Sequence, residues 1–333
     1  MQASVGENVS VASCPGCGAT QFRATGPEAP GFSMEVAGRK FQQSDYFVRE
    51  CLSCGLLYRT PTLSDESLAE YYALVLFQKW EATGYHPIER AVLSVLKSLP
   101  RGSRILDYGC SSGRLLSSLR DEYECYGSEV NSVAAGEAST RGLKMIEPGD
   151  LAGDLPVKFD AIVLVDVFEH LRKPLLLLRQ LMKHASDNAL LVIATGNGDA
   201  AACRRDPAQF WYFRTLEHLS MMTERHAQHL AGAVGLSLEV LTKVCHYDLS
   251  VREKLVLWLH DFVYWQFRRR TFLARTLLPL LPKIRKAGKW TSAPPYTCTR
   301  DHVVAVFRGD EKITEIASTI RSDYSLGKSD CSI

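Results

Sequence analysis

The chain has 333 residues, of which 46% are hydrophobic and 23% are charged, and its formal net charge is +2. This composition excludes disordered and fibrous proteins, and the length is sufficient for a sizeable core and for two domains. The first residues lack the basic patch and apolar run of a secretory signal, and no uncharged apolar run reaches about eighteen residues. We therefore expect a cytoplasmic protein.

Four of the ten cysteines, Cys14, Cys17, Cys51 and Cys54, lie in two Cys-x-x-Cys-Gly motifs. The glycine of each motif can adopt the positive φ angle of a tight knuckle, so that two thiolates face one ion. Together the motifs predict a zinc ribbon over residues 1–60. Four thiolates close the coordination sphere, so the zinc would be structural and would not activate water. The alternatives are two unrelated cysteine pairs or a redox motif.

The region after the ribbon, residues 61–103, is expected to form a helical linker or cap. Ser64 and the two acids that follow it predict a helix start, because carboxylates in the first turn meet unpaired N–H groups. The apolar spacing from Ile88 to Leu99 indicates a second helix. Within the ribbon itself, FSMEVAGRKF is predicted to form a hairpin between the two cysteine motifs.

From Arg104 onward, short β-rich runs alternate with helical stretches. The runs are RILDYG, ECYGSEV, KFDAIVLVDV and NALLVIATG, and the helical stretches include GRLLSSLRDEY and KPLLLLRQLMKHA. This alternation predicts an α/β domain whose parallel sheet is covered by helices on both faces. Ligands of such sheets bind beyond the carboxyl ends of the strands.

The turn in ILDYGCSSGRLL is bracketed by Gly109 and Gly113. It lacks the third glycine of a dinucleotide fingerprint and the Lys-Ser/Thr of a P-loop, which disfavours pyrophosphate and ATP. Asp107 at the strand end offers a carboxylate to an ammonium group, and Glu129, which ends the second strand, is placed like an acid that binds a ribose diol. A ligand with a cationic amino acid at one end and an adenosine ribose at the other is S-adenosylmethionine. The alternative is that each acid caps a helix or pairs with a lysine.

The motifs DYGCSSG, GSEV and FDAIVLVDVFEHL closely resemble those of class I S-adenosylmethionine-dependent methyltransferases, over residues 104–244 with a return at DHVVAVF. The resemblance implies a Rossmann-like seven-stranded core over residues 104–309, in which LSLEVLTKV and DHVVAVFRG are the sixth and seventh strands and pair as a hairpin. The wider pattern adds the cysteine motifs, YRTPTLSDESLAEYY and WYFRTLEHLSMMT. It is similar to bacterial methyltransferases of sugar, polysaccharide and secondary-metabolite pathways.

The resemblance also implies which residues hold the cofactor. Asp107, Gly109 and Gly113 would form the methionine end of the site. Glu129 would bind the ribose hydroxyl groups. Asp150, after the third strand, would meet the adenine amino group, with a plain turn as the alternative.

Four further residues would lie near the transferred methyl group. Asp166, at the end of the fourth strand, would sit beside the methyl donor. Glu169 and His170 follow it as candidate catalytic residues, or else hold the loop beneath the sulfonium. His218, in TLEHLSMMT, resembles a position that faces the acceptor, where a histidine could take a proton from a hydroxyl group. The alternative for His218 is a helix-capping or supporting role.

An insert over residues 245–300 separates the sixth and seventh strands. Between residues 252 and 289 it carries ten Lys and Arg against two acids, a net charge of +8, interleaved with aromatic residues. A basic, aromatic, helical segment can lie on an anionic membrane surface, receive a phosphorylated or lipid-linked substrate, or contact nucleic acid. The alternative is a helical lid whose arginines stay solvated. Residues 310–333 are expected to form a polar tail.

Three functions compete. The pattern favours a methyltransferase that acts on a small-molecule, sugar, glycan or lipid-linked acceptor, with peripheral contact to a membrane or an anionic substrate through the insert. An RNA methyltransferase is disfavoured, because the ribbon region is not notably basic and no RNA-binding signature is present. A catalytically silent binding module would have a damaged cofactor site, whereas DYGCSSG and Glu129 are intact.

Overall fold

The computed structural model describes residues 6–75, 84–280, 284, 286, 290 and 300–309. The expected tail and most of the insert after residue 280 therefore lie outside the described residues. Within the described part of the chain, no helix is both long enough and apolar enough to cross a membrane.

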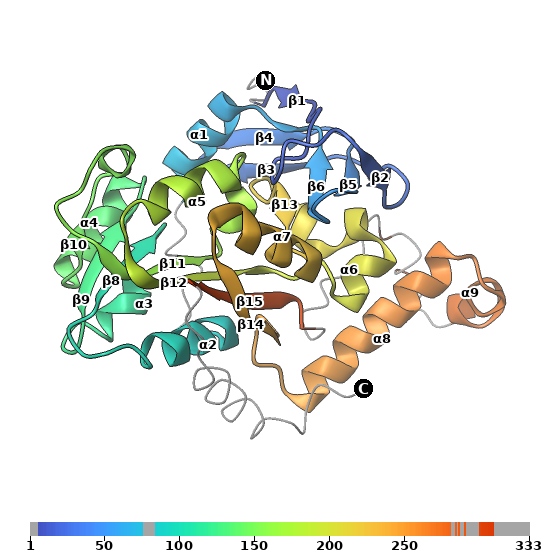
Figure 1. The fold of residues 1–333 in the computed structure, drawn as a ribbon. Helices are drawn as coiled ribbons and strands as arrows, with labels where there is room; N and C mark the ends of the chain where they lie inside the picture. Colours follow the sequence, from blue (N-terminus) through green and yellow to red (C-terminus); the bar gives the residue numbers. More distant parts are fainter. Residues whose placement is uncertain are drawn as a thin grey trace.

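A seven-stranded sheet forms the centre of the molecule (Figure 1). Its strands are β8 (Arg104–Tyr108), β9 (Glu124–Ser128), β10 (Lys144–Met145), β11 (Phe159–Val165), β12 (Ala185–Gly196), β14 (Ser237–Val244) and β15 (His302–Arg308). The spatial order is β10-β9-β8-β11-β12-β15-β14, and only β15 runs antiparallel to its neighbours. The expected seven-stranded core, in which the last two strands pair antiparallel, is confirmed.

Helices cover both faces of this sheet. They are α2 (Pro87–Leu96), α3 (Arg114–Ser117), α4 (Ser132–Thr140), α5 (Pro174–Met182) and α7 (Glu224–Val234), whereas α6 (Ala201–Arg205) packs against the small N-terminal sheet. Side chains alternate between the faces along each strand, so Ile105 and Val163 pack with α2 and α3 on one side. Leu106 and Ile162 pack with α5 and α7 on the other. Strands that are apolar on both faces are typical of a sheet buried between two helical layers.

Helix α3 is shorter than the predicted GRLLSSLRDEY helix. The Ser117 hydroxyl donates to the Arg114 carbonyl at 2.9 Å, and the Ser118 hydroxyl donates to the Leu115 carbonyl at 3.2 Å. Such side-chain bonds compete with the backbone bonds that would extend a helix. The chain continues as turns, in which Leu119 still joins the core.

The N-terminal strands form small antiparallel sheets at the top of Figure 1. Strand β1 (Asn8–Val9) pairs with β7 (Thr62–Leu63), and β3 (Phe32–Val36) pairs with β4 (Arg39–Gln43), which confirms the hairpin. The remaining sheet consists of β2 (Phe22–Ala24), β5 (Phe47–Cys51), β6 (Leu57–Thr60) and β13 (Ser220–Met221). Helix α1 (Asp65–Leu74) starts as predicted, because the Ser64 hydroxyl accepts the Ser67 N–H.

The N-terminal region is continuous with the main core. Strand β13 comes from the segment between β12 and α7, yet it pairs with β6. Cys14, Cys51 and Cys54 belong to the same apolar cluster as Phe168 and Leu230. The cysteine region therefore packs directly on the α5 and α7 side of the sheet.

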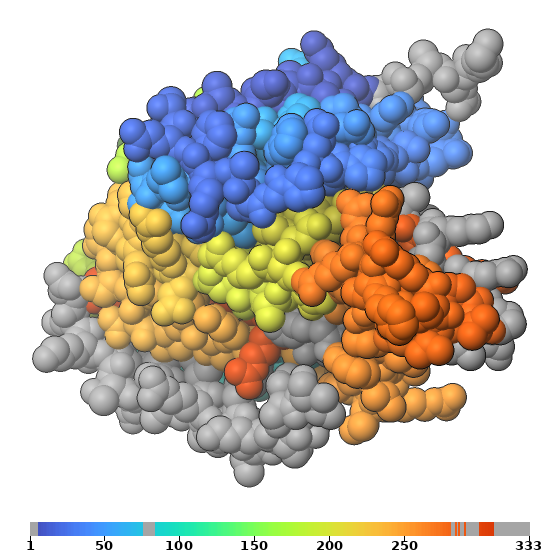
Figure 2. Space-filling view, turned by 90° about the vertical axis from the view of Figure 1, so that its right-hand side faces the viewer, coloured from blue at the N-terminus to red at the C-terminus, as the bar shows by residue number. Residues whose placement is uncertain are grey.

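The described part of the insert is helical, as expected, and is drawn in orange in Figure 2. Helix α8 (Val251–Arg268) begins at a capping box formed by Ser250 and Glu253, and α9 (Phe272–Thr276) follows. The buried residues of α8, which include Val263 and Tyr264, lie in its second half. The remaining short helices are η2 (Asp150–Ala152), η3 (Phe168–His170), η4 (Pro207–Gln209), η5 (Trp211–Arg214) and η6 (Leu278–Leu280).

Candidate functional site

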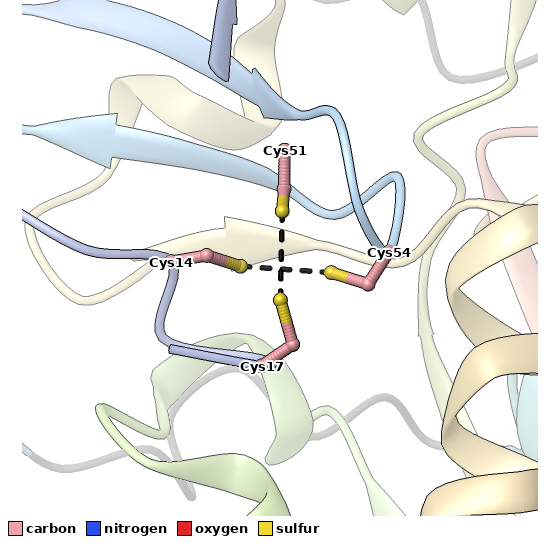
Figure 3. A group of neighbouring side chains, drawn as sticks. All are labelled: Cys14, Cys17, Cys51 and Cys54. Carbon is pink, nitrogen blue, oxygen red and sulfur yellow. Dashed lines mark hydrogen bonds between the residues drawn. The ribbon is translucent and has the colours of Figure 1, made fainter. Parts of the chain in front are cut away.

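The four motif cysteines point toward one centre (Figure 3). Their sulfur atoms all lie within 4.8 Å of one another, with Cys14 Sγ 3.6 Å from Cys54 Sγ and Cys17 Sγ 3.5 Å from Cys51 Sγ. A tetrahedral zinc ion with Zn–S bonds of about 2.3 Å places sulfur atoms about 3.8 Å apart. The donor set and its spacing therefore fit a structural zinc ion, and the alternative of two unrelated cysteine pairs is wrong.

Both cysteine motifs form the same knuckle. Gly18 and Gly55 have φ angles of +79° and +80°, as the motif predicts. The Gly18 N–H donates to the Cys14 carbonyl at 2.8 Å, and the Gly55 N–H donates to the Cys51 carbonyl at 2.9 Å. A side chain at either glycine would be strained in this conformation, which explains why each motif ends in glycine.

Asp107 lies at the carboxyl edge of the sheet, one residue before the end of β8, and is 3% exposed. Burial, followed by the nearby carboxylates of Glu129 and Glu89, raises the pKa of Asp107 to about 7. Among the described residues, no Lys or Arg compensates its charge. A buried carboxylate that lacks a cation suits the ammonium group of an amino acid ligand.

The turn after β8 brings its backbone close to the neighbouring elements. Gly109 and Gly113 have φ angles of +76° and +75°. A Cβ atom at Gly109 would lie 2.5 Å from Val167 Cγ2, and one at Gly113 would lie 2.9 Å from Ala138 Cα. Both glycines are therefore required by the shape of the turn.

Glu129 immediately follows β9 and holds this turn in place. One of its carboxylate oxygens accepts the Ser111 N–H at 3.0 Å and the other accepts the Asn131 N–H at 2.8 Å. Each oxygen keeps a second lone pair for a hydroxyl donor such as a ribose. Asp150 is exposed at the first residue of η2, beyond β10. Its assignment to adenine stays a prediction.

Glu169 is fully buried in η3. Its carboxylate accepts hydrogen bonds from the Tyr212 hydroxyl and, at 2.7 Å, from the Thr195 hydroxyl. Its carbonyl accepts the Leu219 N–H at 2.8 Å. With both carboxylate oxygens engaged by the protein, the geometry favours Glu169 as a positioning residue that holds Tyr212.

The three residues predicted near the acceptor come together, since ligand atoms of Glu169, His170 and His218 lie within 4.8 Å of one another. His218 Nδ1 is 2.7 Å from the Tyr212 carbonyl, which can only accept, so Nδ1 carries the proton and Nε2 has the lone pair. Burial lowers the pKa of His218, so the ring is neutral. His170 Nδ1 lies 3.0 Å from the Tyr72 hydroxyl.

Arg59 fixes the loop that carries His218. Its side chain is fully buried and donates to the carbonyls of Phe213, Thr215 and Leu216, at 3.0, 2.6 and 2.5 Å. Its backbone N–H also donates to the Leu219 carbonyl at 2.8 Å. The strand that follows the second cysteine knuckle therefore shapes the loop around His218.

Asp166 immediately follows β11 and lies beside two histidines that the sequence analysis did not single out. His302 begins β15, His246 follows β14, and one ligand atom of each lies within 4.8 Å of the others and of a carboxylate oxygen of Asp166. The sequence did carry a signal for His302. DHVVAVF forms an antiparallel strand, so its first residues lie at the edge where the parallel strands end.

A model of the methyltransferase domain family matches residues 78–241. In a comparison with curated proteins, nothing matches.

Three similar solved structures are all methyltransferases. A TehB-like SAM-dependent methyltransferase from Corynebacterium glutamicum is 18% identical, with 74% of this chain and 100% of that chain covered and a TM-score of 0.41. A possible histamine N-methyltransferase from Thermotoga maritima is 13% identical, with 74% of this chain and 97% of that chain covered and a TM-score of 0.43. A magnesium protoporphyrin IX methyltransferase from Synechocystis with bound SAH is 18% identical, with 54% of this chain and 92% of that chain covered and a TM-score of 0.41. The matched family model, the strand order of the seven-stranded sheet and the glycine turn between β8 and α3 all indicate a methyltransferase fold. Residues 78–241 therefore form a methyltransferase domain, and the seven-stranded sheet has the fold of the class I S-adenosylmethionine-dependent methyltransferases.

Proposed function

We propose that the chain methylates a small molecule of the sugar, glycan or lipid-linked class and that His218 is its general base. The observation that carries the proposal is the convergence of His218, His170 and the Glu169–Tyr212 pair within one cluster. The cofactor, when bound, supplies an activated methyl group. The chain's own task is to hold the acceptor in line, exclude water and take up the proton that a hydroxyl acceptor releases.

His218 is suited to that task by its tautomer. Because Nδ1–H donates to the Tyr212 carbonyl, the lone pair of Nε2 is available to a hydroxyl group. The Tyr212 ring, whose centroid is 4.0 Å from that of His218, limits its rotation. Glu169 in turn fixes Tyr212 through the tyrosine hydroxyl.

The acceptor class is tested by incubating the zinc-loaded protein with methyl-labelled S-adenosylmethionine and separate panels of nucleotide sugars, lipid-linked sugars and RNA. We expect label in a sugar or lipid-linked product. Transfer to RNA alone would support the alternative function. Binding of S-adenosylhomocysteine without transfer to any panel would favour a silent binding module.

His218→Ala is expected to lower kcat by about a hundredfold or more with the acceptor found in this way, because general base catalysis contributes at least that much. Cofactor affinity should change by less than about twofold, since the site of Asp107 is untouched. Steady-state kinetics and calorimetry measure the two effects. His260→Ala, an exposed histidine on α8, is the matched control. Full turnover by His218→Ala would show that His218 is not the general base.

The proposal includes peripheral binding of α8 to an anionic membrane. Val251, Leu255 and Leu259 follow one another at four-residue spacing and are 68%, 59% and 45% exposed. Trp258 and Phe262 extend the same exposed stripe. Arg268, Arg269 and Arg270 at the end of the helix are exposed as well. An apolar stripe with adjacent arginines fits the interface of a bilayer that contains acidic lipids.

Vesicle flotation tests this part of the proposal. Wild-type protein is expected to float with vesicles that contain phosphatidylglycerol and to stay largely unbound with phosphatidylcholine alone. The double substitution Leu255→Glu and Leu259→Glu should reduce the bound fraction several-fold, because it places two carboxylates in the stripe. Leu176→Glu, at an exposed leucine on α5, is the control. Equal flotation of all three proteins would exclude α8 as the contact.

A further inference from the structure

A second group of potential metal ligands lies at the carboxyl edge of the main sheet. Asp166 follows β11, His302 begins β15 and His246 lies two residues beyond β14. Strands β12 and β14 flank β15, and His302 is paired with Gly196 and Val244 at their ends. The antiparallel direction of β15 thus brings its first residue to the edge where the other strands end.

The three side chains converge. Asp166 has a φ angle of +51°, a conformation that Asp tolerates better than most residues, and its Oδ1 is 3.6 Å from His302 Nε2. The His246 and His302 rings are stacked with centroids 4.4 Å apart. One ligand atom from each of the three residues lies within 4.8 Å of the others.

A fourth residue, Asp301, contacts both histidines of this group. Asp301 is fully buried, and its Oδ1 lies 3.4 Å from His302 Nδ1 while accepting the His246 backbone N–H at 2.9 Å. Histidines that bind metals commonly direct their second ring nitrogen to a carboxylate, which fixes the ring and leaves the other nitrogen for the metal. Asp301 occupies that position relative to His302.

The polar atoms of this group are largely unsatisfied. His302 is buried, yet neither of its ring nitrogens makes a hydrogen bond of acceptable geometry within the described residues. The same holds there for His246 Nδ1, Asp166 Oδ1 and Asp301 Oδ2. Buried polar groups without partners are costly, so unsatisfied atoms on three residues whose ligand atoms lie within 4.8 Å of one another indicate a missing ligand.

We propose that Asp166, His246 and His302 bind a divalent transition-metal ion, distinct from the zinc of the four cysteines. Two imidazoles and one carboxylate form a donor set for Fe(II), Co(II), Zn(II) or Mn(II), and three protein ligands leave coordination positions open. The cluster of Glu169, His170 and His218 offers similar residue types. It is less suited, because both Glu169 oxygens already accept from hydroxyl groups.

The position of this ion indicates what it would do. The Tyr212 ring contacts both groups, with its centroid 4.0 Å from that of His218 and 5.3 Å from that of His302. An ion near His302 would therefore lie close to the region where the proposed function places the acceptor, beside Tyr212 and His218. Its open positions suit an acceptor with two adjacent oxygen atoms, such as a vicinal diol. This role rests on the proposed function, whereas binding of the ion does not.

Calorimetric titration of the cofactor-free, zinc-loaded protein with Co(II) tests the site. We expect one Co(II) per chain while the zinc content stays constant, because Co(II) accepts imidazole and carboxylate ligands. His246→Ala and Asp166→Asn should each weaken Co(II) binding by at least about tenfold. His260→Ala should bind as the wild type does. Thermal unfolding and zinc content show whether each variant is folded.

Two results would overturn the proposal. One is a folded, zinc-loaded wild-type protein that takes up no Co(II) at millimolar concentration. The other is Co(II) binding that both folded variants retain in full, which would place the ion elsewhere. A protonated His302 held between Asp166 and Asp301 would then be the explanation of the cluster. Because no methyl transfer is measured, failure of the metal site and failure of the proposed function are separate outcomes.

Discussion

Asp107→Asn is expected to weaken the binding of S-adenosylhomocysteine by about a hundredfold, because one partner of a buried charge pair is lost. The carboxylate is buried without a compensating Lys or Arg among the described residues, so the ammonium group of the ligand is the cation that it lacks. Calorimetry of the wild type and the variant measures the loss. Asp154→Asn, at an exposed position, is the control. Equal affinity would mean that Asp107 does not bind the ammonium group.

The stability of the Asp107 variant separates this loss from misfolding. A carboxyl group whose pKa is raised to about 7 in the folded protein, against 3.8 for the free residue, lowers stability as pH rises between these values. Above pH 7 the full cost of the buried charge is present. Asp107→Asn removes it, so the cofactor-free variant is expected to unfold at pH 8 at a temperature no lower than the wild type.

Cofactor affinity is expected to fall as pH falls through 7. In the free protein Asp107 must lose its proton before it can pair with an ammonium group. With a pKa of about 7, the dissociation constant for S-adenosylhomocysteine should rise about eightfold between pH 7.5 and pH 6. Titrations across this range measure the effect. Asp107→Asn should show a flat profile, and a wild-type profile that is equally flat would contradict the assignment.

Loss of the zinc ion is the second large effect that we expect. Cys54→Ser should abolish binding of one zinc per chain and lower the unfolding temperature by about 10 °C or more, because metal binding energy is part of the folding energy. Methyl transfer should fall too, since the second knuckle leads into β6, where Arg59 holds the loop of His218. Elemental analysis measures the zinc content, calorimetry measures the unfolding temperature, and transfer of labelled methyl groups measures the activity.

Cys203→Ser is the matched control for this experiment. Cys203 is fully buried but belongs to a separate apolar cluster beside α6. Its substitution is expected to cost some stability while leaving one zinc per chain. A native wild-type protein without metal, or a Cys54→Ser variant with unchanged zinc and stability, would rule out a structural zinc.

The sequence predicts the local features of the site well. Knuckle glycines, the glycine turn after β8 and the start of α1 at Ser64 depend on a few neighbouring residues, and each is found as expected. The predicted helix after Gly113 was too long, because Ser117 and Ser118 bond to carbonyls of their own turn. Apolar periodicity does not predict that these side-chain hydrogen bonds compete with the backbone hydrogen bonds of a helix.

By itself, the sequence predicted the methyltransferase domain, its seven-stranded core, the cysteine cluster and the group of Glu169, His170 and His218. Only the tertiary structure decided that Arg59 holds carbonyls from a loop more than 150 residues away, and that His246 and His302 lie beside Asp166. The physical reason is the separation along the chain of the residues that interact. Turn and strand signals act between near neighbours in the chain, whereas these contacts exist only after β13 joins β6 and β15 enters the sheet antiparallel.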